Sequence, residues 1–481
     1  MALADQIRTT RSYVRSAEPW KLLAWMLPAS LVLFSVLPTG DLAYQIQAGR
    51  IMLSTHDILR HDVFTYTFAG QPWVDQQWGA QILLAALYRL VGWRGLVFAR
   101  ALLVGSAVGL TYRRTRATGS DPTIAGVLSI GAFLVALFVP GTTVLRPQLL
   151  ALPLFIAAAW ILQTRAAHPR RLLILPLIGI VWANVHGSFV LLPLLVSTAA
   201  IDDVVGRTRL SRWTVPLTAA CAITPLASPW GAGTYTYVAG LASSNVIRSV
   251  VQEWQPLFAR WLPAVVFAVA TIVAGSIVMK HRSRAPTLGE TIGIVAFTIL
   301  AVWSARNVIW WALYVPPVLG TLLRGWHPGE RESPPGAVVV APFLLLFAVV
   351  GAVRVLTIEP STALLQDAPA EITSAVQRAT DGGQRLFDGS WGSWFEFALP
   401  GVPVFLDARG EMAPDQVWQD YASVMSAKPG WQSILDDWNI AVVAVPYDGA
   451  PPLIDAMEHA SGWRLVYQDP DGLVFSRAAP G

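Results

Sequence analysis

The segment Leu-Leu-Ala-Trp-Met-Leu-Pro-Ala-Ser-Leu-Val-Leu-Phe-Ser-Val-Leu, residues 22–37, decides the class of this protein. It carries no charge and approaches the roughly 20 apolar residues that a membrane-spanning helix needs. No small-residue cleavage site follows it, so we predict a first spanning helix rather than a cleavable signal peptide. Four basic residues precede it: Arg8, Arg11, Arg15 and Lys21. Basic flanks mark the cytoplasmic side of a membrane, so residues 1–20 are predicted to be a cytoplasmic tail.

The composition of the whole chain extends this interpretation. Of 481 residues, 54% are hydrophobic and 13% are charged, and the mean hydropathy is +0.50. A soluble protein would carry roughly 25% charged residues, so an ordinary cytosolic enzyme is excluded. The single cysteine, Cys221, lies in an apolar run and excludes both a disulfide framework and a cysteine-based metal site.

Clusters of arginine and lysine separate the later apolar runs, as in the cytoplasmic loops of multi-pass proteins. Helices fitted between these clusters predict a mostly α polytopic protein of the cytoplasmic (inner or plasma) membrane with about eleven spans. The spans are expected near residues 21–38, 96–112, 123–140, 148–164, 171–185, 188–205, 213–227, 262–279, 288–305, 308–323 and 336–357. The basic residues follow this topology, so nucleic acid is not predicted as a partner.

Two segments facing outward are too large to be simple connections. The first outer loop, residues 39–95, belongs to the predicted membrane domain 21–357 and holds an amphipathic stretch, 81–90, expected to lie at the interface. The tail, residues 358–481, is predicted to be a soluble, extracytoplasmic, partly parallel α/β domain. Its expected strands are 402–406, 440–445, 463–467 and 472–476, and its expected helices are 413–427, 431–438 and 452–460.

Carboxylates and histidines are concentrated in the first outer loop. Asp41 follows the first span directly, either as the N-cap of a short helix lying on the membrane or as a general base or metal ligand. Two His–Asp pairs, His56-Asp57 and His61-Asp62, lack the spacing of a zinc site. A divalent cation (Mg²⁺, Mn²⁺ or Ca²⁺) held by oxygen atoms of Asp41 and Asp62 stays open. A further carboxylate follows in Pro72-Trp-Val-Asp75-Gln-Gln-Trp78.

These motifs resemble those of bacterial GT-C-type membrane glycosyltransferases, polytopic enzymes that use polyprenyl-phosphate-linked sugars. The resemblance rests on Asp41, on Asp62 before Phe-Thr-Tyr-Thr67, and on the Asp75 motif. Shorter matches are Arg146-Pro147, Trp182-Ala-Asn-Val-His-Gly187, Ser228-Pro-Trp-Gly231, Glu253-Trp254 and Ser304-Ala-Arg-Asn307. Where some relatives carry His–Glu before the second tryptophan, this chain has Gln76 and Gln77, which leaves Asp75 as the carboxylate there.

The resemblance implies transfer of a sugar from a polyprenyl-phosphate carrier to an extracytoplasmic glycan, lipid or protein, with membrane lipids as further partners. Asp41 is the implied base, assisted by Asp62 and Asp75. Arg146 and Arg306 offer bidentate donors to the leaving phosphate. The remaining expected substrate contacts are His186, Asn184, Glu253 and His61.

Structural interpretations compete with each of these roles. The two arginines could reach lipid headgroups, while His186 and Asn184 could stabilise a tight turn. An ion pair of Glu253 with Arg248 is slightly favoured over substrate contact. Arg100, within the second span, is expected to face a cavity or a partner acid, with structural pairing favoured.

The alternative functions are a non-catalytic scaffold or assembly protein of the cell envelope and, less favoured, a lipid or solute transporter. Transport is less favoured because the acids concentrate in an outer loop rather than at the midplane.

Overall fold

A computed structural model describes residues 19–244, 252–281, 285–327, 337–380 and 383–478. The chain divides into two compact units. The helical unit comprises residues up to Ser35 and from Arg94 to Thr357, and the α/β unit comprises Val36–Trp93 and Ile358–Gly481. Nearly all of the predicted basic tail, 1–20, lies outside the described residues.

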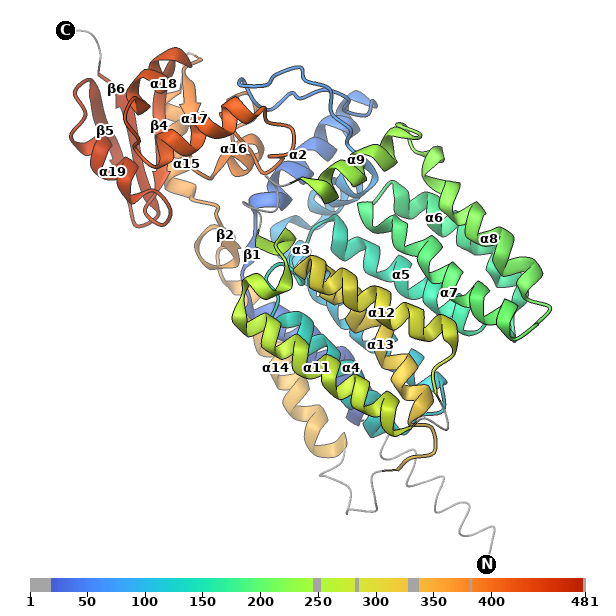
Figure 1. Ribbon diagram of the computed structural model, residues 1–481. Helices are drawn as coiled ribbons and strands as arrows, with labels where there is room; N and C mark the ends of the chain where they lie inside the picture. The colour runs from blue at the N-terminus through green and yellow to red at the C-terminus, as the bar shows by residue number, and fades with distance from the viewer. Residues whose placement is uncertain (1–18, 245–251, 282–284, 328–336, 381–382, 479–481) are drawn as a thin grey trace, which may run out of the picture. The chain divides into compact units, whose positions relative to one another are not determined.

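The helical unit contains a helix for every predicted span (Figure 1). The helices are Pro19–Phe34, the later part of α3 (Trp78–Ala117), α4 (Pro122–Leu137), α5 (Pro147–Gln163), α6 (Leu175–Ala183), α7 (Leu191–Val205), α8 (Ser211–Ile223), α11 (Trp261–Lys280), α12 (Leu288–Trp303), α13 (Val308–Leu322) and α14 (Ala337–Thr357). The sequence did not predict α9 (Gly233–Ser243), which lies in the expected loop 228–261. Short 3₁₀ turns precede several of these helices.

The length and composition of these helices fit a multi-pass membrane protein. Within the described ranges, four helical stretches are long and apolar enough to cross a bilayer: Trp78–Ala117, Gly187–Val205, Trp261–Lys280 and Val340–Thr357. Four shorter apolar helices accompany them: Pro19–Phe34, Pro122–Leu137, Pro147–Gln163 and Leu288–Trp303. The predicted total of about eleven spans therefore stays a prediction.

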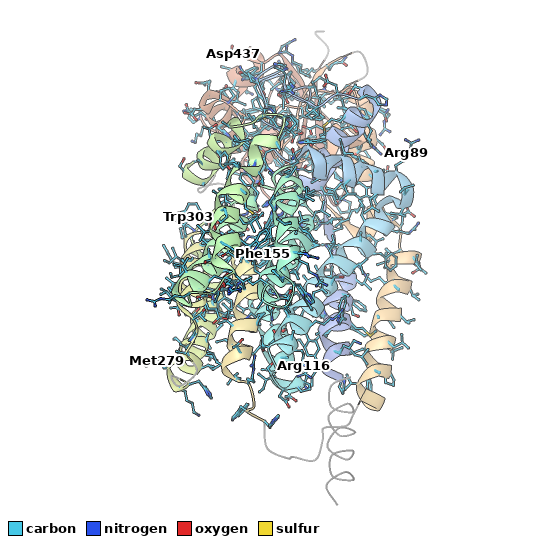
Figure 2. The ribbon with its side chains drawn as sticks, turned by 90° about the vertical axis from the view of Figure 1, so that its right-hand side faces the viewer. Arg89, Arg116, Phe155, Met279, Trp303 and Asp437 are labelled. Carbon is cyan, nitrogen blue, oxygen red and sulfur yellow. The ribbon has the colours of Figure 1, made fainter. Side chains whose placement is uncertain are left out.

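Aromatic side chains form the interior of the helical unit. Phe155 of α5 is completely buried (Figure 2). Its ring centroid lies 5.3 Å from that of Trp310, 5.7 Å from that of Phe297 and 6.2 Å from that of Trp182. Tilted and edge-on ring pairs at such distances are favourable contacts in addition to the burial of apolar area. These contacts join α5, α6, α12 and α13 around one core.

Arg100, inside α3, is held by the end of the first helix. Its Nη2 donates to the carbonyl oxygens of Val32 at 2.7 Å and Ser35 at 3.0 Å, and to the Ser35 hydroxyl at 2.5 Å. Carbonyl groups in the last turn of a helix have no partner within the helix, so a buried guanidinium satisfies them. This geometry agrees with the structural pairing favoured for Arg100.

The α/β unit is built on a four-stranded sheet of order β3-β4-β6-β5, in which β3 and β4 are parallel and the other pairs antiparallel. The strands are β3 (Arg385–Phe387), β4 (Ile440–Pro446), β5 (Trp463–Gln468) and β6 (Gly472–Arg477). Its helices are α2 (Gly40–Thr55), the first part of α3, α15 (Ala370–Ala379), α16 (Gly392–Ala398), α17 (Asp415–Met425), α18 (Trp431–Asp437) and α19 (Pro451–Glu458). A separate parallel pair joins β1 (Leu37–Pro38) to β2 (Leu365–Gln366). The expected partly parallel α/β arrangement is present.

One expected strand, 402–406, does not form. The backbone N–H groups of Phe405 and Leu406 donate to the buried carboxylate of Asp388, at 2.6 and 3.1 Å. A strand would use those groups for its ladder, so the segment is extended but carries only an isolated bridge, from Val404 to Thr65. The parallel neighbour of β4 is instead β3, which the sequence did not predict.

The segment after the first span is part of the α/β unit. Thr67 donates its hydroxyl to the Phe405 carbonyl at 2.6 Å, and the Tyr66 hydroxyl donates to Leu386 at 2.9 Å. Phe68 is buried in the same apolar core as the strands. Residues 39–95 are expected in the membrane domain, whereas the structure groups Val36–Trp93 with the tail. Polar groups of this segment find their partners on the tail, which is why the two pack together.

Helix α2 is an interior helix, not the expected helix lying on a membrane surface. Nearly every residue from Leu42 to Gly49 is buried, and α2 packs against α16. A Cβ at Gly49 would lie 2.1 Å from the carbonyl oxygen of Gln81, so only glycine allows this approach of α2 to α3. The N-cap is Thr39, not Asp41 as expected. Thr39 is held by its hydrogen bond to the Gln366 carbonyl at 2.8 Å, and the helix begins at Gly40.

Candidate functional site

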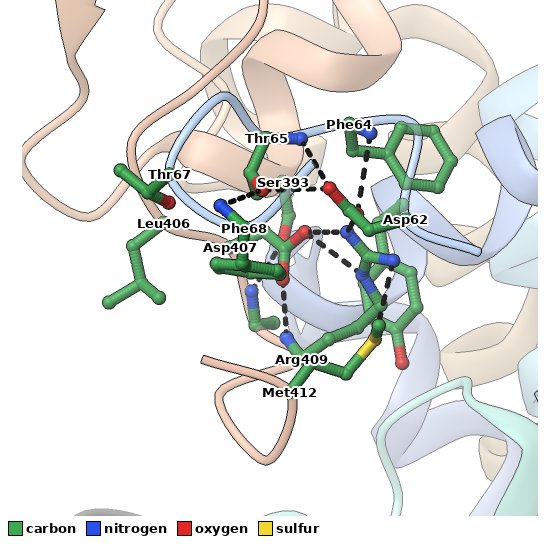
Figure 3. Close-up of polar contacts among 12 residues, drawn as sticks. Asp62, Phe64, Thr65, Thr67, Phe68, Ser393, Leu406, Asp407, Arg409 and Met412 are labelled. Carbon is green, nitrogen blue, oxygen red and sulfur yellow. Dashed lines mark hydrogen bonds and ion pairs between the residues drawn. The ribbon is translucent and has the colours of Figure 1, made fainter. Parts of the chain in front are cut away.

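A buried ion pair joins the loop after the first span to the tail (Figure 3). Nη2 of Arg409 donates to Oδ1 of Asp62 at 2.5 Å and also pairs with Asp407. The other oxygen of Asp62 accepts the backbone N–H of Thr65 at 3.1 Å and its hydroxyl at 2.8 Å. The Asp407–Arg409 ion pair lies within a single turn of the tail. The partnership of Arg409 with Asp62 was not predicted.

Aromatic rings enclose the Arg409 guanidinium. Its central carbon lies 4.5 Å from the ring centroid of Trp73, 4.7 Å from that of Phe64 and 6.0 Å from that of Tyr44. Cation–π attraction is strongest when the cation is removed from water, and the Arg409 side chain is fully buried. The guanidinium is therefore fixed by its acidic partners at its edge and by rings over its faces.

Glu396 adds a further acid to this cluster. Burial, reinforced by the neighbouring Asp407 carboxylate, raises the pKa of Glu396 well above its ordinary value. Burial also opposes ionisation of Asp407, yet Arg409 outweighs it and holds the pKa of Asp407 below its usual range. The two pKa values therefore shift in opposite directions, because Arg409 contacts Asp407 and Asp407 in turn lies beside Glu396. Arg409 forms ion pairs with Asp62 and Asp407.

Asp41 and Asp75 both act electrostatically on Tyr44, whose ring lies beside Arg409. Burial raises the pKa of the Tyr44 phenol, and the charges of Asp41, Glu411 and Asp75 raise it further. Asp75 accepts a hydrogen bond from Gln81 at 2.8 Å, and burial raises its pKa well above the usual value. Asp62 and Asp75 are 3% and 2% exposed, whereas Asp41 is only half-buried. Of the three predicted carboxylates, Asp41 is therefore the most accessible.

The surroundings of Asp62 do not fit a divalent cation. Both of its oxygens already accept hydrogen bonds, and Arg409 places a positive charge where a metal ion would bind. Among the residues that the structure describes, no group of three His, Cys, Asp or Glu side chains is arranged to hold a metal. His61 is exposed, with its backbone bridged to Pro72, so its side chain does not join the buried cluster.

In the helical unit, a second cluster begins with an ion pair between Arg146 and Glu253. Burial raises the pKa of Glu253, but the Arg146 guanidinium outweighs it, so the pKa lies below its ordinary value. Nη2 of Arg146 also donates to the Gly141 carbonyl at 3.2 Å. The favoured partner of Glu253, Arg248, lies outside the described residues, so that pair stays a prediction. Among the described residues, Glu253 pairs with Arg146.

Arg306 belongs to the same cluster. We call this group of Arg146, Glu253, Arg306, Gln148 and His186 the cationic cluster. Nη2 of Arg306 donates to Oε1 of Gln148 at 3.1 Å and lies 3.2 Å from Nε2 of His186, while its guanidinium stacks on Trp254 at 4.5 Å. A guanidinium only donates, so Nε2 of His186 is the acceptor. Burial, with Arg306 and Arg146 nearby, lowers the pKa of His186 well below its ordinary value. The neutral imidazole therefore orients Arg306 without adding charge.

Three residues of this cationic cluster lie at or next to the beginning of a helix. Arg146 is the N-cap of α5, His186 precedes the 3₁₀ turn into α7, and Arg306 lies in the turn that leads into α13. Helix N-termini carry a partial positive charge and unpaired N–H groups, and thus favour anions. Two arginines, one ionised acid and several helix N-termini give the cationic cluster a net positive field.

Sequence reasoning located several of these residues and missed others. Arg146, Arg306, His186 and Glu253 lie together, whereas Asn184 donates to the Ile180 carbonyl at 2.8 Å as the C-cap of α6, in line with its structural interpretation. Gln148 was missed, although a lone amide at the start of an apolar run is a usable signal. The pairing of Trp254 with Arg306 carries no local signal, because the two residues are far apart in the chain.

No family model matches this sequence, and no curated protein matches it. Two solved structures from Archaeoglobus fulgidus share its fold. One is the archaeal oligosaccharyltransferase AglB in complex with an inhibitory peptide and a dolichol-phosphate, with a TM-score of 0.52 and 11% identity over 96% of this chain and 73% of that one. The other is the apo oligosaccharyltransferase, with a TM-score of 0.52 and 12% identity over 96% and 74%. At 11–12% identity, these two structures show that the chain shares their fold.

Proposed function

We propose that this chain is a membrane glycosyltransferase that moves a sugar from a polyprenyl-phosphate carrier to an extracytoplasmic acceptor. The acceptor would be a glycan, a lipid or a protein. The chain would cross the cytoplasmic membrane about eleven times, with its N-terminus in the cytoplasm and its α/β unit outside. The GT-C fold supports the general class. The observation that carries the proposal is the cationic cluster of Arg146, Arg306 and His186 at the beginnings of helices.

The cationic cluster suits a phosphate that acquires charge as it leaves. When the bond from the anomeric carbon to the phosphate oxygen breaks, its electron pair stays on the phosphate. Arginine presents a planar fork of donors that matches phosphate oxygens. His186 and Gln148 hold Arg306 in one orientation before the reaction, and such preorganised donors lower the cost of charge development.

Asp41 is the proposed general base. It would accept the proton of the acceptor hydroxyl while that oxygen forms its bond to the anomeric carbon, and direct displacement would invert the configuration there. A base must be ionised and within reach of the substrate, and Asp41 is the least enclosed of the three loop carboxylates. Asp62 and Asp75 would act as positioning residues, through Arg409 and Tyr44. No step is assigned to a metal ion.

The test compares Asp41→Asn with Asp57→Asn, an exposed carboxylate in the same loop. The purified full chain would be incubated with a panel of synthetic polyprenyl-phosphate hexoses and pentoses and a membrane extract as the acceptor source. Release of free polyprenyl phosphate would be measured by mass spectrometry. General-base catalysis contributes about 10²–10⁴-fold, so Asp41→Asn should lose at least about 100-fold while Asp57→Asn keeps its rate. Unimpaired release by folded Asp41→Asn would discard the assignment.

A non-catalytic scaffold of the cell envelope is the second candidate. The observation that favours it is the enclosure of Asp62 and Asp75, whose carboxylates make intramolecular contacts. A scaffold would bind polyprenyl phosphate through the cationic cluster without releasing it from any donor. Binding of polyprenyl phosphate that depends on Arg306, together with no turnover of the whole donor panel, would select the scaffold over the enzyme.

A further inference from the structure

The α/β unit contains a pocket that the proposed function does not use. It measures about 480 Å³ and lies between α2 and the first part of α3. Its lining residues are Arg50, Leu53, Ser54, Ala85, Tyr88, Arg89 and Gly92. None of these lining residues is acidic and two are arginines, so the pocket wall carries positive charge. We call it the Arg50–Arg89 pocket.

Arg50 is fixed by aromatic rings. Its guanidinium carbon lies 4.3 Å from the ring centroid of Phe397 and 4.8 Å from that of Tyr88. Within the described part of the chain, the guanidinium makes one hydrogen bond, a long one of 3.4 Å to the Gln47 side chain. Stacking uses the faces of a guanidinium and leaves N–H donors along its edge. Arg50 is therefore held in place with donor capacity to spare.

The second arginine, Arg89, is exposed and labelled at the surface in Figure 2. Exposed apolar side chains occur in the same part of α3: Leu90 is 80% exposed and Leu83 and Val91 about half exposed. On the pocket side, Leu53 is also exposed. A pocket lined by two arginines, with exposed leucines in the same helices, matches a ligand that has an anionic head and an apolar body.

An aromatic group lies behind this pocket. Tyr88 contacts Trp93 and Phe397 at centroid distances of 5.0 and 5.4 Å, and Trp93 contacts Trp394 at 6.1 Å. Tyrosine and tryptophan concentrate where a protein meets the headgroup layer of a membrane. In the chain, Trp93 directly precedes Arg94, where the helical unit resumes with the apolar part of α3. The Arg50–Arg89 pocket is thus next in sequence to a predicted span.

We propose that the Arg50–Arg89 pocket binds the phosphate of an anionic bilayer lipid, with Arg50 and Arg89 donating to the phosphate oxygens. Leu53 and Leu90 would lie along the acyl chains. The lipid would be a ligand distinct from the sugar carrier, because this pocket contains neither the proposed base nor the cationic cluster. Bound lipid would anchor the α2–α3 pair to the membrane through a charge-specific contact in addition to its apolar residues.

The test uses the detergent-purified full chain and native mass spectrometry with dioleoyl phosphatidylglycerol or dioleoyl phosphatidylcholine as the probe. The variant Arg50→Gln/Arg89→Gln is compared with Lys428→Gln/Arg464→Gln, which removes the same charge from exposed positions of the same unit. The wild type and the control should bind one phosphatidylglycerol about tenfold more tightly than phosphatidylcholine. The pocket variant should lose that preference, because charge-assisted hydrogen bonds to phosphate are lost. Arg89→Gln alone, an exposed change, should lose part of it even if Arg50→Gln perturbs packing.

Two outcomes would overturn this proposal. The first is an unchanged preference for phosphatidylglycerol in folded Arg89→Gln and in the double variant. The second is displacement of phosphatidylglycerol by inorganic phosphate at equal concentration, which would identify a site for a free anion instead of a lipid. Resistance of the bound lipid to inorganic phosphate, with loss in the pocket variants alone, supports the lipid site.

Discussion

Asp62 and Arg409 form a fully buried ion pair, 2.5 Å from Oδ1 to Nη2, although 347 positions separate them in the chain. Asp62 lies in the segment that follows the first span, and Arg409 lies in the tail. The pair, together with the bridge from Thr65 to Val404, makes one α/β unit from two distant stretches. The membrane helices are thus inserted between two parts of a single folded unit.

Replacing Arg409 with methionine is expected to destabilise the α/β unit by about 3–5 kcal/mol, because it leaves buried carboxylates without their cation. The matched control is Arg477→Met, which breaks the partly exposed ion pair with Asp436. Pairs of that kind contribute less than about 1 kcal/mol. The measurement is thermal unfolding of the purified full chain. Equal losses in the two variants would contradict a stabilising role for the enclosed guanidinium.

Asp388 is expected to make stability depend on pH. Burial raises the pKa of this carboxyl to about 7, although the N–H groups of Phe405 and Leu406 oppose the effect. The folded chain then holds a proton that the unfolded chain releases near pH 3.8, its ordinary pKa. The contribution of this proton to the free energy of unfolding is complete below about pH 4 and is lost as pH rises through 7. The total loss is about 4 kcal/mol.

The variant Asp388→Asn tests this dependence, since an amide can still accept from the two N–H groups but does not titrate. Denaturant unfolding between pH 4 and 8 should show a flatter profile for the variant than for the wild type, with the difference concentrated in that window. Asp437→Asn, an exposed acid of the same unit, is the control and should keep the wild-type profile. Parallel curves for Asp388→Asn and the wild type would refute the assignment.

Arg306→Lys is expected to weaken binding of polyprenyl phosphate by about tenfold or more without altering the charge. A lysine ammonium is a compact point charge and cannot bond Gln148 and His186 while presenting a planar fork to phosphate. Arg260→Lys, at the start of α11, is the control and should bind normally. Binding of polyprenyl phosphate to the purified full chain, measured by native mass spectrometry, gives a readout independent of turnover. Wild-type affinity in Arg306→Lys would argue against phosphate contact.

Gly92→Ala is expected to destabilise the chain by about 1–3 kcal/mol, because Gly92 has φ 60° and ψ −166°, a region that only glycine adopts readily. A Cβ there would meet no atom within 4 Å, so the cost is backbone strain and not a clash. Gly131→Ala, in α4 with equally open space, should be neutral or stabilising. The two thermal midpoints are compared directly. A neutral Gly92→Ala would mean that the break in α3 can relax into a continuous helix.

Much of the helical architecture could be predicted because its signal is local. Each expected span coincides with a helix to within a few residues, since length and apolar composition are properties of the segment itself. The strands β4, β5 and β6 were located for the same reason. The segment 402–406 had an equally good strand pattern, yet Asp388 takes the N–H groups that a ladder needs. That competition comes from another part of the chain and leaves no local trace.

The residues of the candidate site also differ in whether a local signal identifies them. Residue type and position next to helix ends, together with the family resemblance, selected Asp41, Arg146, His186 and Arg306 as candidates. The partners of Arg146 and Arg306, Glu253 and Gln148, are 107 and 158 positions away. Charge alone does not choose between Arg248 and Arg146 as the partner of Glu253, because the sequence predicts both in segments on the same side of the membrane.

The amino-acid sequence by itself determined that this is a multi-helix membrane protein with a mixed α/β tail, since hydrophobic length and period act within each segment. Only the tertiary structure decided which acids are enclosed and which are accessible. It buried Asp62 against Arg409 and Asp75 against Gln81, and left Asp41 half-buried. The physical reason is that burial and charge pairing depend on neighbours in space, and those neighbours are brought together by folding.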